Sequence, residues 1–306
     1  MTELFVHAKV LIDGISDTPK FDQLISIEDD KIKAIEDYHE IQENVIEVNT
    51  ITPGFFNCHV HILYPVGFDS KKEFSFIEKI FYAQKHCKEY LQSGVTFIRV
   101  VGTEQNYDLQ IKEAIQNDVI QGPHMYCAGK VICMTGGHGW QEGIEADGKD
   151  ACLKAVRTQL KSGVDLIKMM ATGGVMTKGV EPGNAQLSVE EMKVMIEEAH
   201  KAGRKTATHA QGLQGIKNAL YAGIDSIEHG CFLDEECLEL MKKQNTFLVP
   251  TLCAPQCIID KGIENGVAKY AVTKTLKVKD AHVESVKKRL RKRYSDCTRY
   301  RCRYTI

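Results

Sequence analysis

Four short segments of this chain each end an apolar, strand-like run on a side chain that can bind a metal ion. Imidazole nitrogens are good ligands for zinc and similar divalent ions. In the first segment two histidines stand two positions apart, so on an extended backbone both emerge on the same face and could hold one ion together. In chain order the candidate ligands are His59 and His61, Lys168, His209 and His229.

The lysine is the unusual member of this set. Lys168 lies inside the apolar run 164–170, where a buried and unpaired ammonium would cost several kcal/mol. Burial lowers the pKa of a lysine and makes its amine nucleophilic. Reaction with carbon dioxide would then give a carbamate, an anionic ligand able to bridge two metal ions. The alternative is a lysine paired with a carboxylate, such as Glu228, across the interior.

Two glycine-rich segments, 135–140 and 171–176, could let a substrate approach the backbone. His138 lies in the first of them and is our candidate for binding a substrate carboxylate or carbonyl, with an incidental loop histidine as the alternative. The remaining histidines fall outside strand ends, and we expect them to be structural or solvated. They are His7, His39, His86, His124, His200 and His282.

From Pro53 onward the chain repeats a pattern of strand, loop and amphipathic helix. One helix is marked clearly in 187–203, where Ser188 and Glu191 form a capping box. Alternating elements predict a parallel sheet with outer helices, and we favour a (β/α)8 TIM-type barrel over a doubly wound open sheet. An open sheet would usually carry a glycine-rich phosphate turn where this chain has two histidines. The seven predicted strands are 55–61, 94–101, 122–127, 164–170, 205–209, 224–229 and 246–251.

The chain divides into three predicted parts. Residues 1–52 contain short β-like runs, with a hairpin turn at 28–30, and predict a small N-terminal β-sandwich segment. Residues 53–290 form the predicted hydrolase barrel, which we expect to be incomplete at strand eight. Residues 291–306 read as an aberrant basic tail.

The overall composition is that of an ordinary soluble protein, with 43% hydrophobic and 26% charged residues and a pI near 6.6. No apolar run reaches the ~20 residues of a membrane span, and no secretion signal is recognisable. The eleven cysteines are scattered without a Cys-x-x-Cys pair, which indicates reduced thiols and a cytoplasmic protein. We therefore expect no nucleic-acid or membrane partner, and leave open whether the chain forms a homo-oligomer.

Segment 53–61 resembles the first-strand signature of the amidohydrolase superfamily. Lys168, His209 and His229 match the later strand-end ligands of that family in order and context. Segment 168–188 is similar to the branch that includes Xaa-Pro dipeptidases and imidazolonepropionase-like relatives, and the lysine argues for the dipeptidase side. One departure is Asn57, where the family often has aspartate; it precedes the ligands.

This resemblance implies a distorted barrel with a β-sandwich built from both chain ends, and one or two Zn²⁺ or other divalent ions that activate a water molecule. It also implies an aspartate after strand eight that moves the proton. This chain has no such aspartate in a Gly-Thr-Asp setting, so no catalytic residue is assigned. We expect an amidohydrolase that cleaves an Xaa-Pro dipeptide or an N-acyl amino acid, impaired in this chain. A non-catalytic metal-binding relative is the alternative.

The tail suggests why the aspartate is missing. Residues 287–306 hold nine Lys and Arg against one Asp, whereas residues 1–286 hold 30 basic and 40 acidic residues. One legal codon spelling of 292–306, read one base later, encodes Ser-Gly-Ile-Arg-Ile-Ala-Leu-Gly-Thr-Asp-Ala-Gly-Thr-Pro, a strand ending in the missing motif. We hypothesise a frameshift near 287–293. The alternative is a basic arm that binds nucleic acid or an acidic partner.

Overall fold

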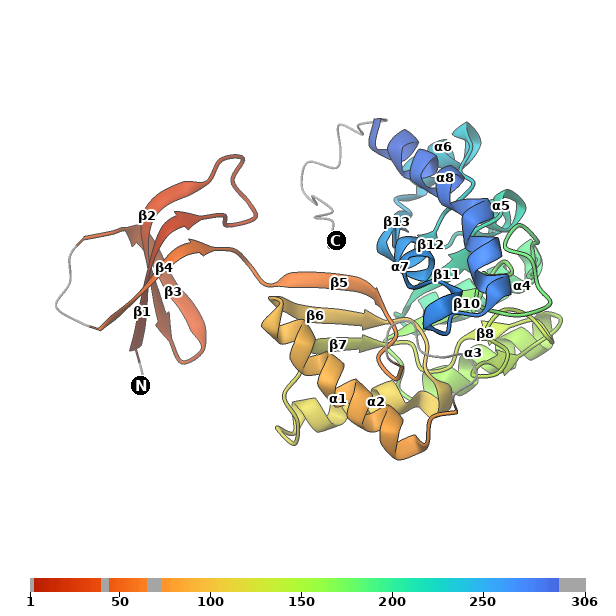
Figure 1. The fold of residues 1–306 in the computed structure, drawn as a ribbon, viewed down its shortest axis with the longest axis horizontal. Coiled ribbons are helices and arrows are strands. Elements are labelled where there is room, and N and C mark those ends of the chain that lie inside the picture. The colour runs from red at the N-terminus through yellow and green to blue at the C-terminus, as the bar shows by residue number, and fades with distance from the viewer. Residues whose placement is uncertain (1–2, 40–43, 65–72, 292–306) are drawn as a thin grey trace. The chain divides into compact units, whose positions relative to one another are not determined.

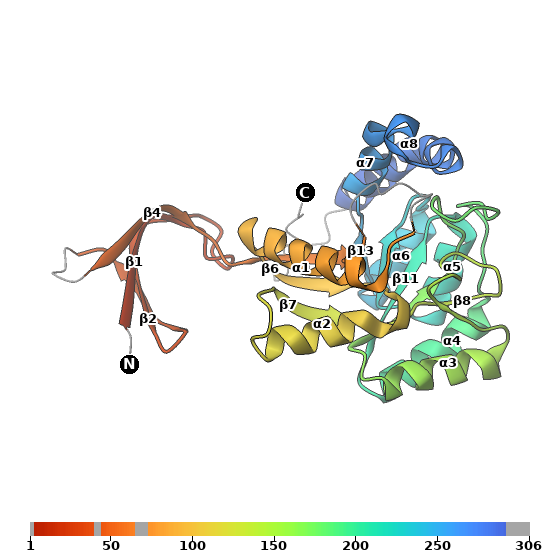
Figure 2. The same ribbon diagram turned by 60° about the horizontal axis from the view of Figure 1, so that its bottom comes forward.

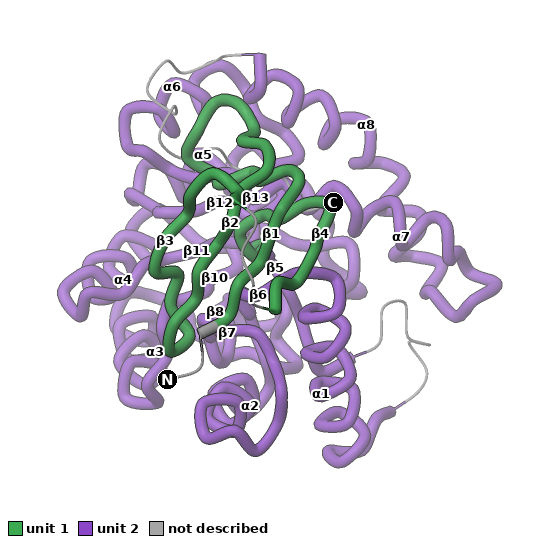
Figure 3. The backbone as a smooth tube through the Cα atoms, turned by 90° about the vertical axis from the view of Figure 1, so that its left-hand side faces the viewer, with its two compact units in different colours: residues 1–55, 298–301 green, residues 56–297, 302–306 purple. Residues whose placement is uncertain are grey.

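The computed structural model describes residues 3–39, 44–64 and 73–291 of the 306-residue chain. They form two compact units, of which the first ends at Phe55 and the second begins at Phe56 (Figure 3). The predicted aberrant tail, 291–306, falls outside the described residues except for Arg291. In the part of the chain that is described, no helix is long and apolar enough to cross a bilayer.

The first unit is built around a four-stranded sheet in the order β3-β2-β1-β4. The predicted hairpin turn is confirmed between β2 and β3, where Asp29 and Asp30 have positive φ angles of 47° and 62°, as a tight hairpin requires. The described residues of this first unit form a single sheet, so the second layer of a sandwich stays a prediction. The strands are β1 (Glu3–Leu11), β2 (Lys20–Glu28), β3 (Lys31–Asp37) and β4 (Val45–Ile51).

All seven strands predicted for the second unit are present, within about three residues of the predicted ends (Figure 1). Two short strands, β8 (Ile132–Cys133) and β9 (Ile144–Glu145), were not predicted, because two-residue strands carry no usable periodicity. The predicted ones are β5 (Phe55–Val60), β6 (Val95–Val100), β7 (His124–Cys127), β10 (Leu166–Met170), β11 (Lys205–Ala210), β12 (Ser226–His229) and β13 (Phe247–Val249).

These strands form two sheets, in the orders β5-β6-β7 and β13-β12-β11-β10-β8-β9. The registered pairs are parallel, so the carboxyl ends of neighbouring strands lie at the same edge. This confirms the predicted α/β class. Among the described residues β5 and β13 are edge strands, so closure of the barrel is not confirmed.

Helices follow the strands along the chain, and several of them pack on the sheets. Helix α4 begins at the predicted capping box, in which Ser188 accepts from the backbone of Glu191, and its apolar face is buried at Met192, Ile196 and Ala199. The helices are α1 (Phe76–Gln92), α2 (Tyr107–Gln116), α3 (Lys149–Lys161), α4 (Val189–Lys201), α5 (Leu213–Ala222), α6 (Glu235–Gln244), α7 (Cys253–Lys261) and α8 (Lys269–Arg291), with 3-10 turns at Glu104–Asn106 and Ile263–Asn265.

The main core lies between helices α3–α6 and the strands of the larger sheet, and a second core lies under α1 and α2 against β6 and β7 (Figure 2). Every residue of β10 is buried, Lys168 included. Because both faces of β10 are covered, its apolar run is continuous rather than alternating, which is typical of parallel sheets. The core therefore holds rigid the strand ends on which the candidate ligands lie.

Candidate active site

The four predicted histidine ligands lie together. The ring centroids of His59 and His229 are 5.0 Å apart, those of His209 and His229 are 4.6 Å apart, and those of His59 and His61 are 5.4 Å apart. They come from the carboxyl ends of β5, β11 and β12, of which β11 and β12 are parallel neighbours. Residues up to 170 positions apart in sequence thus form one imidazole cluster.

Two of these rings are fixed by backbone carbonyl groups. His61 Nδ1–H donates to the carbonyl oxygen of Gly102 at 3.2 Å, and His209 Nε2–H donates to that of Gly173 at 3.1 Å. A carbonyl can only accept, so each bond selects one tautomer and leaves the other ring nitrogen with its lone pair. This is the way in which metal-binding histidines are usually oriented.

The other two rings are fixed by side chains. His59 Nδ1 lies 2.8 Å from Glu228 Oε2, and His229 Nδ1 lies 2.6 Å from Thr251 Oγ1. The backbone φ of His229 is +71°, which is uncommon for a residue with a Cβ and is found at functional sites more often than elsewhere. Asn57, the departure from the family pattern, accepts a hydrogen bond from the backbone N–H of His59 and so supports the segment locally.

Burial keeps the cluster neutral. Removal from water lowers the pKa of His61 to about 3 and holds the pKa values of His209 and His229 well below their ordinary value. Burial also lowers the pKa of His59, although the Glu228 carboxylate opposes it. Neutral imidazole is the form that binds metal ions, so these rings are ready to act as ligands at neutral pH.

The rings contact one another but are not arranged as a finished coordination sphere. No group of three or more His, Cys, Asp or Glu side chains within the described residues is placed so that it could hold a metal ion as it stands. The chemistry of the donor set nevertheless suits such an ion, because each of the four rings is anchored through one nitrogen and its second nitrogen bonds to none of the described residues.

Lys168 is 2% exposed in the middle of β10. Burial lowers the pKa of its amine to about 8; the charge of Glu228 acts in the opposite direction, and the charge of Arg99 adds to the lowering. The alternative reading, a lysine ion-paired with Glu228, is not what these residues show, since no ion pair within 4.0 Å joins them and Glu228 pairs with His59 and Arg99 instead. A carbamate on Lys168 stays a prediction.

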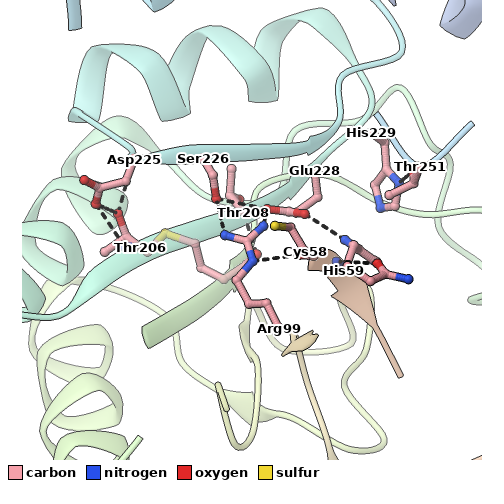
Figure 4. Close-up of polar contacts among 12 residues, drawn as sticks. Cys58, His59, Arg99, Thr206, Thr208, Asp225, Ser226, Glu228, His229 and Thr251 are labelled. Carbon is pink, nitrogen blue, oxygen red and sulfur yellow. Dashed lines mark hydrogen bonds and ion pairs between the residues drawn. The ribbon is translucent and has the colours of Figure 1, made fainter. Parts of the chain in front are cut away.

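Arg99 was missed by sequence reasoning. From β6 it donates through Nη2 to Glu228 Oε1 at 2.7 Å and through Nε to the carbonyl oxygen of Cys58 at 2.7 Å (Figure 4). With Arg99 and His59 as partners, the pKa of Glu228 falls to about 2 although burial alone would raise it. The available signal was a single charged residue inside the apolar strand 95–100.

His138 lies at the edge of the cluster, with its ring centroid 4.2 Å from that of His209. Its Nδ1 is 2.7 Å from the hydroxyl of Thr177, and its backbone N–H donates to Gln186 at 2.9 Å. Gly174 lies against the ring so closely that an added Cβ would be 2.5 Å from two ring atoms. The two glycine-rich segments therefore meet at His138, and burial lowers its pKa to about 3.

Most of the other described histidines bond to groups outside the four rings or, like His39 and His124, are exposed. His86 bonds to the carbonyl oxygen of Ile62, and His200 to Asp225. His282 is buried, with 1% of its surface exposed. These placements agree with the expectation that they are structural or solvated.

Residues 50–294 match the model of the amidohydrolase family. The chain belongs to this family. An ochratoxinase of Aspergillus niger is 30% identical to it over 281 aligned residues, which cover 81% of this chain and 57% of the ochratoxinase. The chain thus spans little more than half the length of this curated relative.

Solved structures with the same fold include a Xaa-Pro dipeptidase with methionine bound in its active site. It has a TM-score of 0.87 and 30% identity, over 95% of this chain and 77% of the dipeptidase. The A. niger ochratoxinase gives a TM-score of 0.81 at 27% identity, over 94% and 73% of the two chains. A prolidase complexed with N-methylphosphonate-L-proline gives 0.85 at 25% identity, over 95% and 76%. These neighbours support the barrel-type architecture over a doubly wound sheet.

Proposed function

We propose that this amidohydrolase-family chain binds one or two divalent ions, zinc first, and hydrolyses a C–N bond. The proposed ligands are the imidazole cluster together with Lys168, which we propose to be carbamylated. One observation carries the proposal: four neutral imidazoles from three strand ends lie within 4.6–5.4 Å of their neighbours. The ligands are His59, His61, Lys168, His209 and His229.

The anchoring of the rings explains how they would hold an ion. Each ring would keep its bond to Gly102, Gly173, Glu228 or Thr251 and would offer its second nitrogen to the ion. A divalent ion bound there supplies a water of lowered pKa and polarises the carbonyl of the scissile bond. The protein contributes a dry, rigid set of neutral donors, since burial keeps the imidazoles unprotonated.

His138 would orient the substrate. Its Nδ1 is held by Thr177, whereas its Nε2 bonds to none of the described residues and is free for a substrate carbonyl or carboxylate. We assign it to substrate binding.

The preferred substrate is an Xaa-Pro dipeptide, followed by an N-acyl amino acid. The support is similarity to structures described as a Xaa-Pro dipeptidase and as a prolidase with a proline-containing phosphonate. An ochratoxinase is also similar. The chain covers only part of each of these proteins, so the activity and substrate of the whole protein are part of the proposal.

The test combines elemental analysis with hydrolysis assays on the purified chain. We expect at least one zinc or other divalent ion per chain, lost in His209→Asn, and slow release of free proline from Xaa-Pro dipeptides, because we expect the chain to be impaired. His124→Asn is a matched control, because His124 is exposed at the amino end of β7, whereas the proposed histidine ligands lie at the carboxyl ends of their strands. A wild-type chain that retains no divalent ion after incubation with zinc contradicts the proposal.

A non-catalytic metal-binding protein is the second candidate. It is favoured by the sequence, which places no aspartate in a Gly-Thr-Asp setting anywhere in the 306 residues. Stoichiometric zinc without hydrolysis of any dipeptide in the panel would support this candidate. Measurable turnover that is lost with the metal would exclude it.

A further inference from the structure

A fully buried carboxylate stands between two of the strands that bear the imidazoles. Glu228, on β12 directly before His229, has no exposed surface. Its Oε2 contacts His59 Nδ1 at 2.8 Å, and its Oε1 accepts from Arg99 at 2.7 Å and from Ser226 Oγ at 3.0 Å. A buried carboxylate is stable only when it is paired, and these partners supply the pairing.

Arg99 joins the carboxylate to the backbone that carries the first ligand. Besides the Glu228 contact, its Nη1 donates to Ser226 at 3.0 Å and its Nε to the carbonyl of Cys58 at 2.7 Å, the residue before His59 (Figure 4). A planar guanidinium holds such partners in fixed directions, which a lysine cannot do. One side chain of β6 therefore fixes both the peptide before His59 and the carboxylate that grips its ring.

We propose that the Arg99–Glu228 ion pair is a positioning device for His59, which sets its tautomer and ring orientation so that Nε2 presents a lone pair to the candidate metal site. This inference rests on the proposed function only where it concerns metal. The carboxylate accepts a hydrogen bond from Nδ1–H of His59, and the guanidinium holds the carboxylate in place. Arg99 and Glu228 touch no substrate; they act through His59.

The pair makes its two members interdependent. Removal of Arg99 alone leaves the Glu228 carboxylate buried without its cation, which lowers the stability of the fold. Removal of both charges leaves neither of these side chains as an unpaired charge in the interior. The double variant Arg99→Met/Glu228→Gln should therefore lose less free energy of unfolding than the two single variants lose together. A pair of independent structural residues would lose the full sum.

The experiment measures two quantities on the full chain. The first is the tautomer of His59 in the metal-free protein, from ¹⁵N NMR of the imidazole nitrogens, assigned with His59→Gln. The second is zinc affinity by competition with a chelator. In Glu228→Gln we expect a mixture of tautomers and an affinity roughly 10- to 100-fold lower, the usual effect of removing such a partner. Arg99→Lys should give an intermediate zinc affinity, because lysine keeps the positive charge but lacks the fixed donor directions of a planar guanidinium.

Asp225→Asn is the matched control. Asp225 directly precedes β12 and bonds to Thr206, His200 and Lys205, so the same change from carboxylate to amide is made without touching the cluster. We expect unchanged His59 tautomer and zinc affinity. A Glu228→Gln chain that is folded and matches the wild type in both quantities overturns the proposal.

Failure of this inference is separable from failure of the proposed function. If the wild-type chain binds no zinc, the proposed function is wrong, but the NMR measurement still tests the pair. If wild-type His59 carries its proton on Nε2, the positioning role is wrong whatever the metal affinity is. This last measurement needs no folded variant at Glu228 or Arg99.

Discussion

Lys274 of helix α8 donates a hydrogen bond to the carbonyl oxygen of Thr177, 97 positions away in sequence, at 2.8 Å. The same amine also donates to the carbonyl of Val180, and the hydroxyl of Thr177 lies 2.7 Å from His138. Lys274 is 6% exposed, so its bonds are protected from water. Helix α8 thus anchors the loop around Thr177, and the Thr177 hydroxyl in turn contacts His138 at the edge of the imidazole cluster.

Lys274→Met should therefore loosen the loop. We expect faster amide hydrogen exchange in 173–184 and a loss of about 1.5–3 kcal/mol in the free energy of unfolding, the range for hydrogen bonds to charged groups. Lys287→Met is the control, since Lys287 lies on the same helix, is 51% exposed and pairs with Glu284 of that helix rather than with the loop. Equal exchange in the two variants would show that Lys274 does not anchor the loop.

Gly174→Ala should displace His138. The new Cβ would be 2.5 Å from the Nε2 and Cε1 atoms of His138, so the ring must move. We expect weaker substrate binding with zinc affinity retained, and a stability cost of about 1–3 kcal/mol for the overpacking. Thermal unfolding and substrate titration check this. Gly183→Ala, where a Cβ meets nothing within 4 Å, should be silent; an equal effect of both would contradict the prediction.

The ionised Asp225 carboxylate should add to the free energy of unfolding at neutral pH, and this contribution should be lost in acid. Burial raises its pKa, but hydrogen bonds from Lys205, His200 and Thr206 outweigh this effect and leave the pKa below its ordinary value. A carboxyl whose folded-state pKa is depressed stabilises the fold above its unfolded pKa of about 3.9 and loses that contribution as pH falls through the folded-state value.

Urea unfolding of wild type and Asp225→Asn across pH measures this contribution. We expect a difference in the free energy of unfolding of about 2 kcal/mol near pH 7, shrinking steadily below pH ~4. A difference that stays constant down to pH ~2 would mean that the carboxylate charge is not the source.

Lys168→Met tests the carbamate. Incubation of the chain with ¹³C-bicarbonate should give a carbamate carbonyl signal in ¹³C NMR that is missing in the variant, because a buried amine with a pKa near 8 is neutral often enough to react. Lys205→Met, which removes an 80% exposed lysine on the neighbouring strand, should keep the signal. A wild-type spectrum without any such signal, in the presence of zinc, rules the carbamate out.

Local sequence patterns determined the strands and the candidate ligands. The strand 166–170 and its buried lysine could be predicted, because a charged residue inside an unbroken apolar run is expected to be buried with that run. Helix α4 could be predicted because its capping box and its apolar face lie in one short, continuous segment of the sequence. The convergence of His59, His209 and His229 follows once the strands are known to be parallel.

What only the tertiary structure decided is which partners the buried charges take. Glu228 was named from the sequence only as an alternative partner of Lys168, yet it binds His59 and Arg99. Lys274 carried no signal at all, because its partners are carbonyl groups 94 and 97 positions away. Strand and helix periodicity report only which face of an element is buried. The choice among several buried partners depends on distances across the interior, which are set by the packing of the whole chain.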